Sequence, residues 1–160
     1  MQVKIGLTEA QREGVCRVLQ ALLADEFVLY TKARNYHWNV IGPQFHDLHK
    51  LFEEQYEALS DMVDEVAERI RTLGGVAPGT LEEFRKAARL REEPGVVPPA
   101  LQMVRNLASD HEAIVRQLRQ DIPVVQDQHN DVGTADFLTG LMEKHEKYAW
   151  MLRATATESV

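Results

Sequence analysis

The feature that most constrains the fold is one long amphipathic run between Phe45 and Leu73. Its apolar residues follow one another at intervals of three, four or seven, which places them on one face of an α-helix. Gly42-Pro43 precedes the run and Gly74-Gly75 follows it, so the sequence predicts a helix of about 29 residues, roughly 43 Å long. A helix of this length needs partners of similar length, which favours a helical bundle. The apolar face consists of Leu48, Phe52, Leu59, Val63, Val66, Ile70 and Leu73.

Three other stretches have helical periodicity, at residues 8–39, 99–122 and 134–154. Thr8 and Gln11 have the spacing of a capping box at the start of the first stretch. We expect Pro123 to stop the second, because proline lacks the N–H that a helix interior requires. The loop QDQHNDVG is expected before the last stretch. Together with the central run, these stretches predict an all-α, four-helix bundle.

A connector of about 24 residues, 74–97, separates the second and third long helices. It is too long for the short turn that joins adjacent antiparallel helices. Thr80 and Glu83 form a second capping-box pattern, so a short extra helix is expected from there to about Leu90. A long crossover lets the second and third helices run parallel, as in ferritin-like bundles.

The central helix carries two pairs of potential metal ligands. His49 and Glu53 lie one turn apart on one side of it, and Asp64 and Glu68 repeat that spacing. The two pairs cannot share an ion within one helix. Glu53 and Asp64 differ by roughly 20° in azimuth, but they lie about 16 Å apart along the axis.

These four positions are symmetric about one point near Leu59. If two copies of the helix cross antiparallel at that point, His49 of one chain faces Glu68 of the other, and Glu53 faces Asp64. Two identical sites with mixed His and carboxylate ligands would then form between the chains.

His37 fits the same geometry, because it precedes Pro43 by six residues and His49 follows Pro43 by six. Antiparallel packing of the first two helices would bring both imidazoles to one level. One chain would then supply His37, His49 and Glu53. Two imidazoles with carboxylates suit a redox-active iron better than structural zinc, which favours cysteines.

A simpler interpretation stays open for each part of this set. A His with an acid four residues later also fits a solvated helix face, and His37 alone also fits a hydrogen-bonded histidine at the core boundary. The symmetry of the complete set of five residues favours the metal site.

The segments HWNV, GPQFHDLHKLFEEQY and DMVDEVAERIRTLGG resemble the Dps family, the mini-ferritins or DNA-binding proteins from starved cells. The resemblance extends over most of the chain. It implies a ferroxidase centre at a two-fold interface, built from His37, His49 and Glu53 of one subunit and from Asp64 and Glu68 of its partner. Some members carry Asp at the position of Glu53, where Glu keeps the carboxylate on a longer arm.

The resemblance also implies the reaction and the assembly. Fe(II) would be oxidised to Fe(III), preferably by hydrogen peroxide and otherwise by oxygen. Ferric mineral would be stored in a hollow homo-dodecamer that protects against oxidative damage. The tryptophan after the first histidine, Trp38, lies near the iron in the family and traps stray oxidising equivalents there; a packing role is the simpler interpretation of this residue.

Three acids, Asp127, Asp131 and Asp136, cluster where the last helix begins. Acids at a helix N-terminus are explained by the helix dipole and by loop solvation. In Dps shells, acids in this region line three-fold pores that admit iron, so the three are also candidate pore residues.

The bulk properties predict one domain, 1–160, with 44% hydrophobic residues. No apolar run approaches the roughly 18 residues that a membrane helix needs, and the N-terminal residues lack the apolar core of a signal peptide. Cys16 has no intrachain disulfide partner. These features predict a cytoplasmic protein, with nucleoid association left open.

The net charge is −7, which is unfavourable for binding nucleic acid. Lys4 is the only basic residue before the first helix, and the tail ATATESV after Arg153 has none. Dps members that condense DNA often use lysine-rich termini, so a DNA-binding, nucleoid-protecting role is the alternative function and is disfavoured here.

Two further alternatives belong to other classes. An intrasubunit di-iron protein usually carries Glu-x-x-His motifs on its bundle helices. No acid in this chain has His three residues later, which argues against that class. A metal-free helical scaffold is the remaining alternative, and iron binding to the apoprotein separates it from the ferroxidase.

Overall fold

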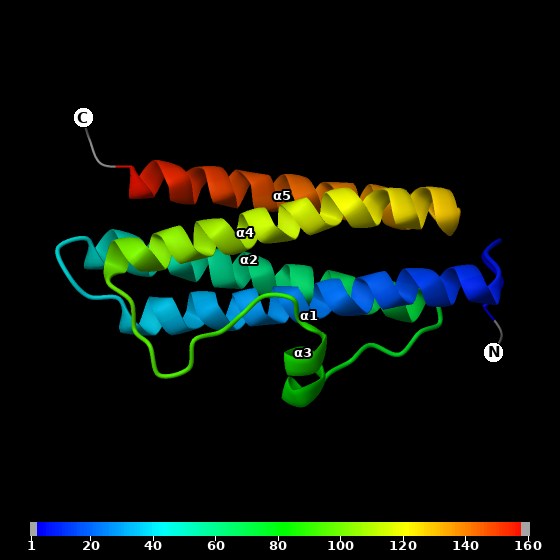
Figure 1. Cartoon of the computed structure of the whole chain (residues 1–160), viewed down its shortest axis with the longest axis horizontal. Helices are drawn as coiled ribbons and strands as arrows, with labels where there is room; N and C mark the ends of the chain where they lie inside the picture. Colours follow the sequence, from blue (N-terminus) through cyan, green and yellow to red (C-terminus); the bar gives the residue numbers. More distant parts are fainter. Residues whose placement is uncertain (1–2, 158–160) are drawn as a thin grey trace.

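Two antiparallel helical hairpins pack against each other in the computed structural model, which describes residues 3–157 (Figure 1). The first hairpin is α1 with α2, and the second is α4 with α5. The predicted all-α, four-helix bundle is confirmed. The elements are α1 (Glu9–Asn39), α2 (Phe45–Thr72), α3 (Leu81–Ala87), α4 (Ala100–Pro123), the π-turn η1 (Val124–Gln128) and α5 (Val132–Ala156).

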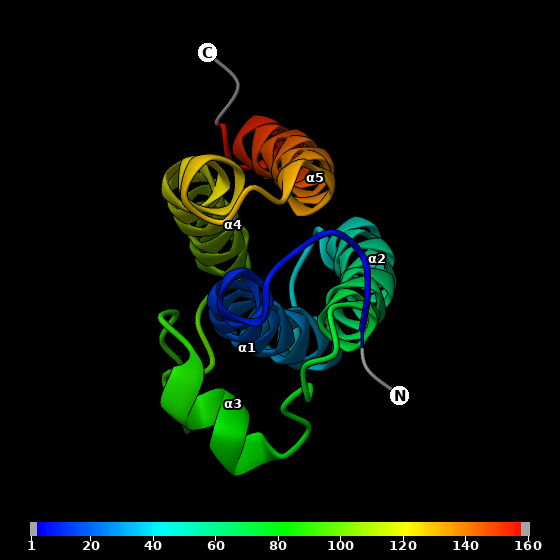
Figure 2. The same cartoon turned by 90° about the vertical axis from the view of Figure 1, so that its right-hand side faces the viewer.

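The long connector runs along the outside of the bundle. It carries α3, which lies beside α1 and away from α5 (Figure 2). The crossover returns the chain to the end of the bundle where α2 began, so α2 and α4 run parallel, as the connector length predicts (Figure 1).

Both predicted capping boxes are present. The Gln11 backbone N–H donates to Thr8 Oγ1, and the Thr8 N–H donates to Gln11 Oε1 at 2.9 Å. Thr80 and Glu83 make the same pair of contacts at α3. Each box satisfies backbone N–H groups that the first turn of a helix leaves without partners. Just after the C-terminal end of α2, Gly74 has φ +88°, a conformation that glycine adopts without strain.

Helix α3 ends at Ala87, three residues before the predicted end at Leu90. The cause is the buried carboxylate of Asp25 on α1, which accepts the backbone N–H groups of Arg89 and Leu90 at 2.6 and 3.0 Å. The Arg89 guanidinium adds an ion pair to Asp25 at 2.7 Å. These N–H groups bond a side chain from another helix instead of carbonyls in their own, so the chain leaves the helical path.

Helix α4 ends at Pro123, as predicted, but the chain does not leave the helical path there. Helix α4 includes Pro123, and the chain continues into η1 before Asn130 takes φ +54°. Proline costs a hydrogen bond in a helix interior, and here the wider π-turn follows at once, which keeps the chain helical at the price of a local change of pitch. Helix α5 then begins at Val132, two residues before the predicted start.

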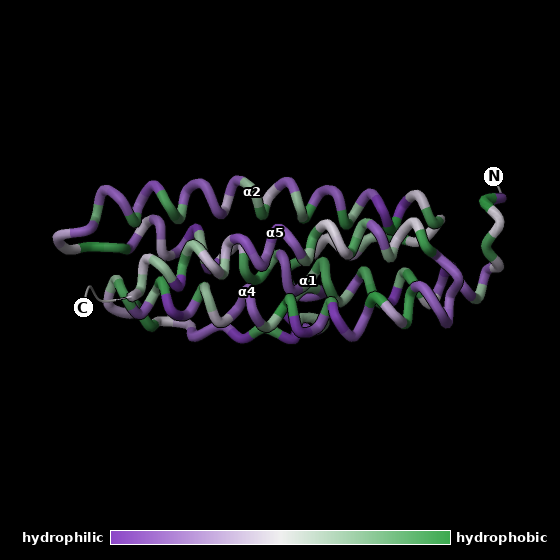
Figure 3. The backbone as a smooth tube through the Cα atoms, turned by 90° about the horizontal axis from the view of Figure 1, so that it is seen from above, coloured by the Kyte–Doolittle hydropathy of each residue, from purple (hydrophilic) through white to green (hydrophobic). Residues whose placement is uncertain are grey.

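The core runs the length of the bundle between the four long helices. Apolar positions recur along each of them between hydrophilic ones (Figure 3). The α2 stripe is buried as predicted except for Val63, which is partly buried, and Leu59, Val66 and Ile70 are 0% exposed. Burying each such side chain contributes about 1.5–3 kcal/mol. Gly14 leaves room for the His129 ring, which a Cβ at this position would overlap.

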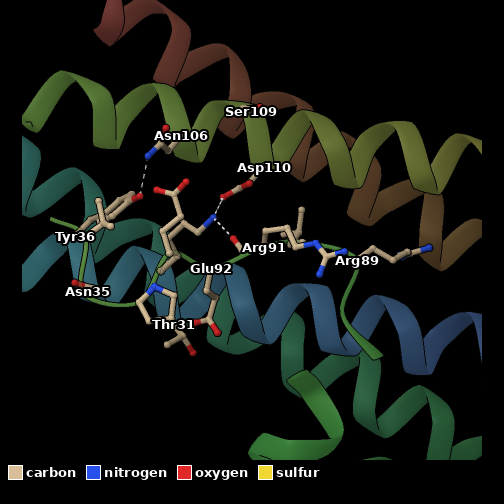
Figure 4. Close-up of a pocket in the computed structure, with 14 residues that line it drawn as sticks. Thr31, Asn35, Tyr36, Arg89, Arg91, Glu92, Asn106, Ser109 and Asp110 are labelled. Atoms are coloured by element: carbon tan, nitrogen blue, oxygen red, sulfur yellow. Dashed lines mark hydrogen bonds and ion pairs between the residues drawn. The ribbon is translucent and has the colours of Figure 1, made fainter. Parts of the chain in front are cut away.

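A groove of about 460 Å³ lies between the connector and helices α1 and α4 (Figure 4). Across its floor, the Lys32 ammonium donates to the Arg91 carbonyl and forms an ion pair with Asp110 at 2.6 Å. Asn106 donates to the Tyr36 hydroxyl at 3.0 Å. The first contact ties the connector to α1, and the other two tie α1 to α4.

Candidate metal centre

Two histidines meet where the first hairpin turns. His37 lies in the last turn of α1 and His49 in the second turn of α2, and their rings stack with centroids 3.7 Å apart. The prediction that both imidazoles lie at one level is therefore confirmed.

Each ring is held by the backbone of the other residue. His37 Nδ1 lies 2.8 Å from the His49 carbonyl oxygen, and His49 Nδ1 lies 2.8 Å from the His37 carbonyl oxygen. A carbonyl oxygen only accepts, so each Nδ1 carries the proton, and the tautomer of both rings is fixed. Both Nε2 atoms then keep a free lone pair. Metal-binding histidines have this arrangement, in which a second partner orients the ring.

Aromatic neighbours enclose the pair. Phe45 stacks on His49 with centroids 5.0 Å apart, and Tyr56 presents its edge to His37 at 5.2 Å. His37 is only 8% exposed. The two rings therefore have little freedom to turn before a ligand arrives.

Glu53 joins this group through Tyr56. It lies one turn after His49 on α2, and the Tyr56 hydroxyl donates to its Oε1 at 3.5 Å, the long limit of a hydrogen bond. Burial, followed by the negative charges of Glu53 and Glu57, raises the pKa of Tyr56, so its hydroxyl stays protonated. The structure thus brings His37, His49 and Glu53 to one end of the first hairpin.

The other two predicted ligands lie elsewhere on the subunit. Asp64 and Glu68 are exposed on the second half of α2, and Glu53 is about 16 Å from Asp64 along the helix axis. Within residues 3–157, no group of three or more His, Cys, Asp or Glu residues of one chain is placed to hold a metal ion. The roles of the five residues as ligands stay predictions.

Two residues at this site, Arg34 and Tyr56, were not predicted from the sequence. The Arg34 guanidinium lies over the Tyr56 ring at 4.8 Å and over the Trp38 ring at 5.3 Å, and it donates to the Tyr30 hydroxyl at 2.6 Å. Trp38 itself is 65% exposed, so in the subunit it does not pack into the core. Tyr30, Arg34 and Trp38 are spaced by four, a pattern that could have indicated this cluster on α1.

The three candidate pore acids differ in environment. Asp131 is 5% exposed and is the N-cap of α5, where its carboxylate accepts the Thr134 backbone N–H at 3.0 Å. Arg69 of α2 forms an ion pair with the same carboxylate at 3.3 Å. Asp127 and Asp136 are exposed. Asp131 thus has a structural role in the subunit, and a pore role stays a prediction for all three.

None of the helices described is both long enough and apolar enough to cross a lipid bilayer. The C-terminal tail ATATESV was noted above for its lack of basic residues. Its last three residues, 158–160, lie outside the described part of the chain.

Comparisons with known proteins agree with this architecture. The model of the ferritin-like domain family matches residues 16–158. The low temperature-induced protein all0458 of Nostoc is 52% identical over 153 residues, which cover 96% of this chain and 86% of that protein.

Two solved structures are similar over nearly their full length. DpsC from Streptomyces coelicolor superposes with a TM-score of 0.95 at 28% identity, covering 100% of this chain and 93% of that one. The Dps protein of Vibrio cholerae, described as a member of the ferritin-like diiron-carboxylate superfamily, has a TM-score of 0.89 at 30% identity, with 98% and 99% covered.

Proposed function

Because the chain belongs to the Dps family of ferritin-like proteins, we propose that it oxidises ferrous iron at sites shared between two subunits and stores the ferric product. The sites would lie within a closed shell of twelve subunits. The observation that carries the proposal is the His37–His49 pair, whose tautomers are fixed so that both Nε2 atoms are free to bind a metal.

The proposed ligands have complementary roles. His37 and His49 bind the ion through neutral nitrogen, which suits Fe(II) and leaves coordination positions open for an oxidant. Glu53, with Asp64 and Glu68 of a second subunit, supplies negative charge that favours Fe(III). The set of imidazole and carboxylate donors fits iron as the substrate.

Hydrogen peroxide is the proposed oxidant, with oxygen as the second choice. Two Fe(II) ions give one electron each to peroxide, which takes up two protons and becomes two water molecules, leaving two Fe(III). Because both electrons are delivered at one site, no hydroxyl radical is released. The protein would thereby protect the cytoplasm against oxidative damage.

We do not propose DNA binding. The net charge is −7, and the first helix is preceded by a single basic residue, Lys4. Nucleic-acid binding depends on lysine and arginine that displace counterions from phosphates, and residues 1–8 and 154–160 contain only Lys4.

A mixing experiment tests whether the site is shared. One variant carries His37→Ala and His49→Ala, and the other carries Asp64→Ala and Glu68→Ala. Each alone should lose fast iron oxidation in stopped-flow measurements. When the two are unfolded together and reassembled, each mixed dimer has one site with all four changes and one with none, so activity should return to at most about half per mixed dimer.

Mass spectrometry of the reassembled protein must show that mixed dimers have formed. If they form and oxidation stays slow, the ligands do not come from two chains, and the shared-site proposal fails.

A further inference from the structure

A second histidine pair lies in the middle of the bundle, far along the chain from the candidate metal centre. His111 of α4 and His145 of α5 contact through their Nδ1 atoms at 2.8 Å, and His145 Nε2 lies 2.7 Å from Glu26 Oε1 of α1. All three side chains are 0% exposed. They form one hydrogen-bonded chain across three helices, with Glu26 Oε2 and His111 Nε2 buried and without partners at its two ends.

The number of protons that Glu26, His145 and His111 share follows from their contacts. Each contact needs one proton between its two atoms, because two lone pairs or two N–H groups would repel at this separation. Those two protons alone leave one net negative charge. A third proton, on His111 Nε2, makes the group neutral, which a dry interior strongly favours.

The position of the third proton, on His111 Nε2, sets the direction of the imidazole contact. In the neutral group His145 donates through Nδ1 and shares its other proton with Glu26, and His111 is uncharged and accepts. Burial, and then the nearby His145, hold the pKa of His111 well below its ordinary value, which agrees with an uncharged His111.

A fourth proton cannot enter without damage. On His111 Nδ1 it would set two N–H groups face to face and break the imidazole contact. On Glu26 it would remove the negative charge that balances His145. In either case the three residues together gain a net positive charge, which a dry interior disfavours.

This hydrogen-bonded group of three side chains joins the two hairpins of the subunit, because Glu26 belongs to α1 and both histidines belong to the α4–α5 hairpin. We propose that Glu26, His145 and His111 form an acid-sensitive latch, which holds the two hairpins together near neutral pH and releases them when the core takes up a further proton. The latch is independent of the proposed iron chemistry.

The other groups around the latch do not replace it as the titrating element. Tyr148 of α5 packs on His111 with centroids 5.6 Å apart, and burial followed by Glu54 and Asp61 of α2 raises its pKa, so it stays neutral in acid. Asp110, the neighbour of His111 on α4, is neutralised by Lys32 of α1. Gln55, the polar side chain among the buried residues of α2, does not titrate.

The test compares unfolding at several pH values for the full-length protein and for His111→Asn. The asparagine carbonyl can accept from His145 Nδ1, but it cannot take a proton. Below about pH 6.5, the ordinary pKa of imidazole, the three latch residues together bind one more proton in the unfolded wild type than in the folded wild type. Its unfolding constant should therefore rise on acidification by up to about tenfold more per pH unit than that of the variant.

The matched control is His46→Asn, which makes the same change on an imidazole that is 79% exposed. It should leave the pH dependence of the wild type unchanged. Equal pH slopes for the wild type and His111→Asn would overturn the proposal.

If His111→Asn does not fold, hydrogen exchange of the unmutated protein decides. After correction for the chemical exchange rate, protection around Glu26, His111 and His145 should collapse between pH 7 and pH 5 before protection at the His37–His49 turn. Protection that persists around the three residues until the whole subunit unfolds would refute the latch.

Discussion

Two histidine pairs, one at the end of the bundle and one at its centre, differ in what their Nδ1 atoms contact. In the His37–His49 pair each Nδ1 donates to a backbone carbonyl, so both Nε2 atoms stay free. In the His111–His145 pair the Nδ1 atoms bond each other, and His145 Nε2 is engaged by Glu26. The first arrangement leaves two ring nitrogens free for the proposed metal, and the second leaves His145 no free ring nitrogen. The contacts of the ring nitrogens, rather than the closeness of two imidazoles, decide between ligand and core residue.

The largest effect is expected from breaking the central pair. His145→Leu removes the cation beside a fully buried Glu26, and leaving such a charge without a partner costs about 3–5 kcal/mol. Urea unfolding at pH 7 and fixed protein concentration measures the loss of unfolding free energy. His46→Leu is the surface control. A cost below about 1 kcal/mol for His145→Leu would show that Glu26 is already neutral in the folded protein.

Breaking the terminal pair should affect iron rather than stability. His49→Ala removes one oriented ligand and the ring that stacks on His37, so affinity for Fe(II) should fall by about ten- to a hundredfold. Anaerobic titration calorimetry with Fe(II) measures the change. His46→Ala, three residues earlier on α2, should bind iron like the wild type, and an equal loss in both variants would contradict the assignment.

The smallest effect is expected at the aromatic wall of the terminal pair. Tyr56→Phe keeps the ring against His37 and removes only a hydroxyl that contacts Glu53 at 3.5 Å. A hydrogen bond of that length contributes little, so the initial rate of iron oxidation should change by less than about threefold. A larger loss would mean that Tyr56 sets the position of Glu53.

Local patterns predicted the helices and the terminal pair well. The α2 stripe and the Thr8 capping box depend on neighbours within four residues, and the level of His37 and His49 follows from equal distances to Pro43. The hydrogen-bonded group of Glu26, His145 and His111 could not be predicted, because Glu26 and His145 are 119 residues apart. In the sequence, each of them is simply a polar residue near an apolar helix face. The early end of α3 was missed for the same reason, since its cause, Asp25, lies on another helix. Helix α4 ends at Pro123 as the general rule predicts, but the π-turn η1 that follows it was not predicted.

The attachment of the connector to Asp25 has a consequence for how the chain tolerates changes in length. Asp25 fixes the backbone at Arg89 and Leu90, so the crossover consists of two independent spans. The Arg91 carbonyl is also held, by Lys32, and the second span, residues 92–97, is exposed throughout. Insertions there lengthen a surface loop at little entropic cost, because the cost of closing a loop grows only slowly with its length. An insertion between Phe84 and Leu90 would instead shift the backbone N–H groups away from Asp25. Within one crossover, therefore, some positions are free to diverge in length and others are fixed by a single carboxylate.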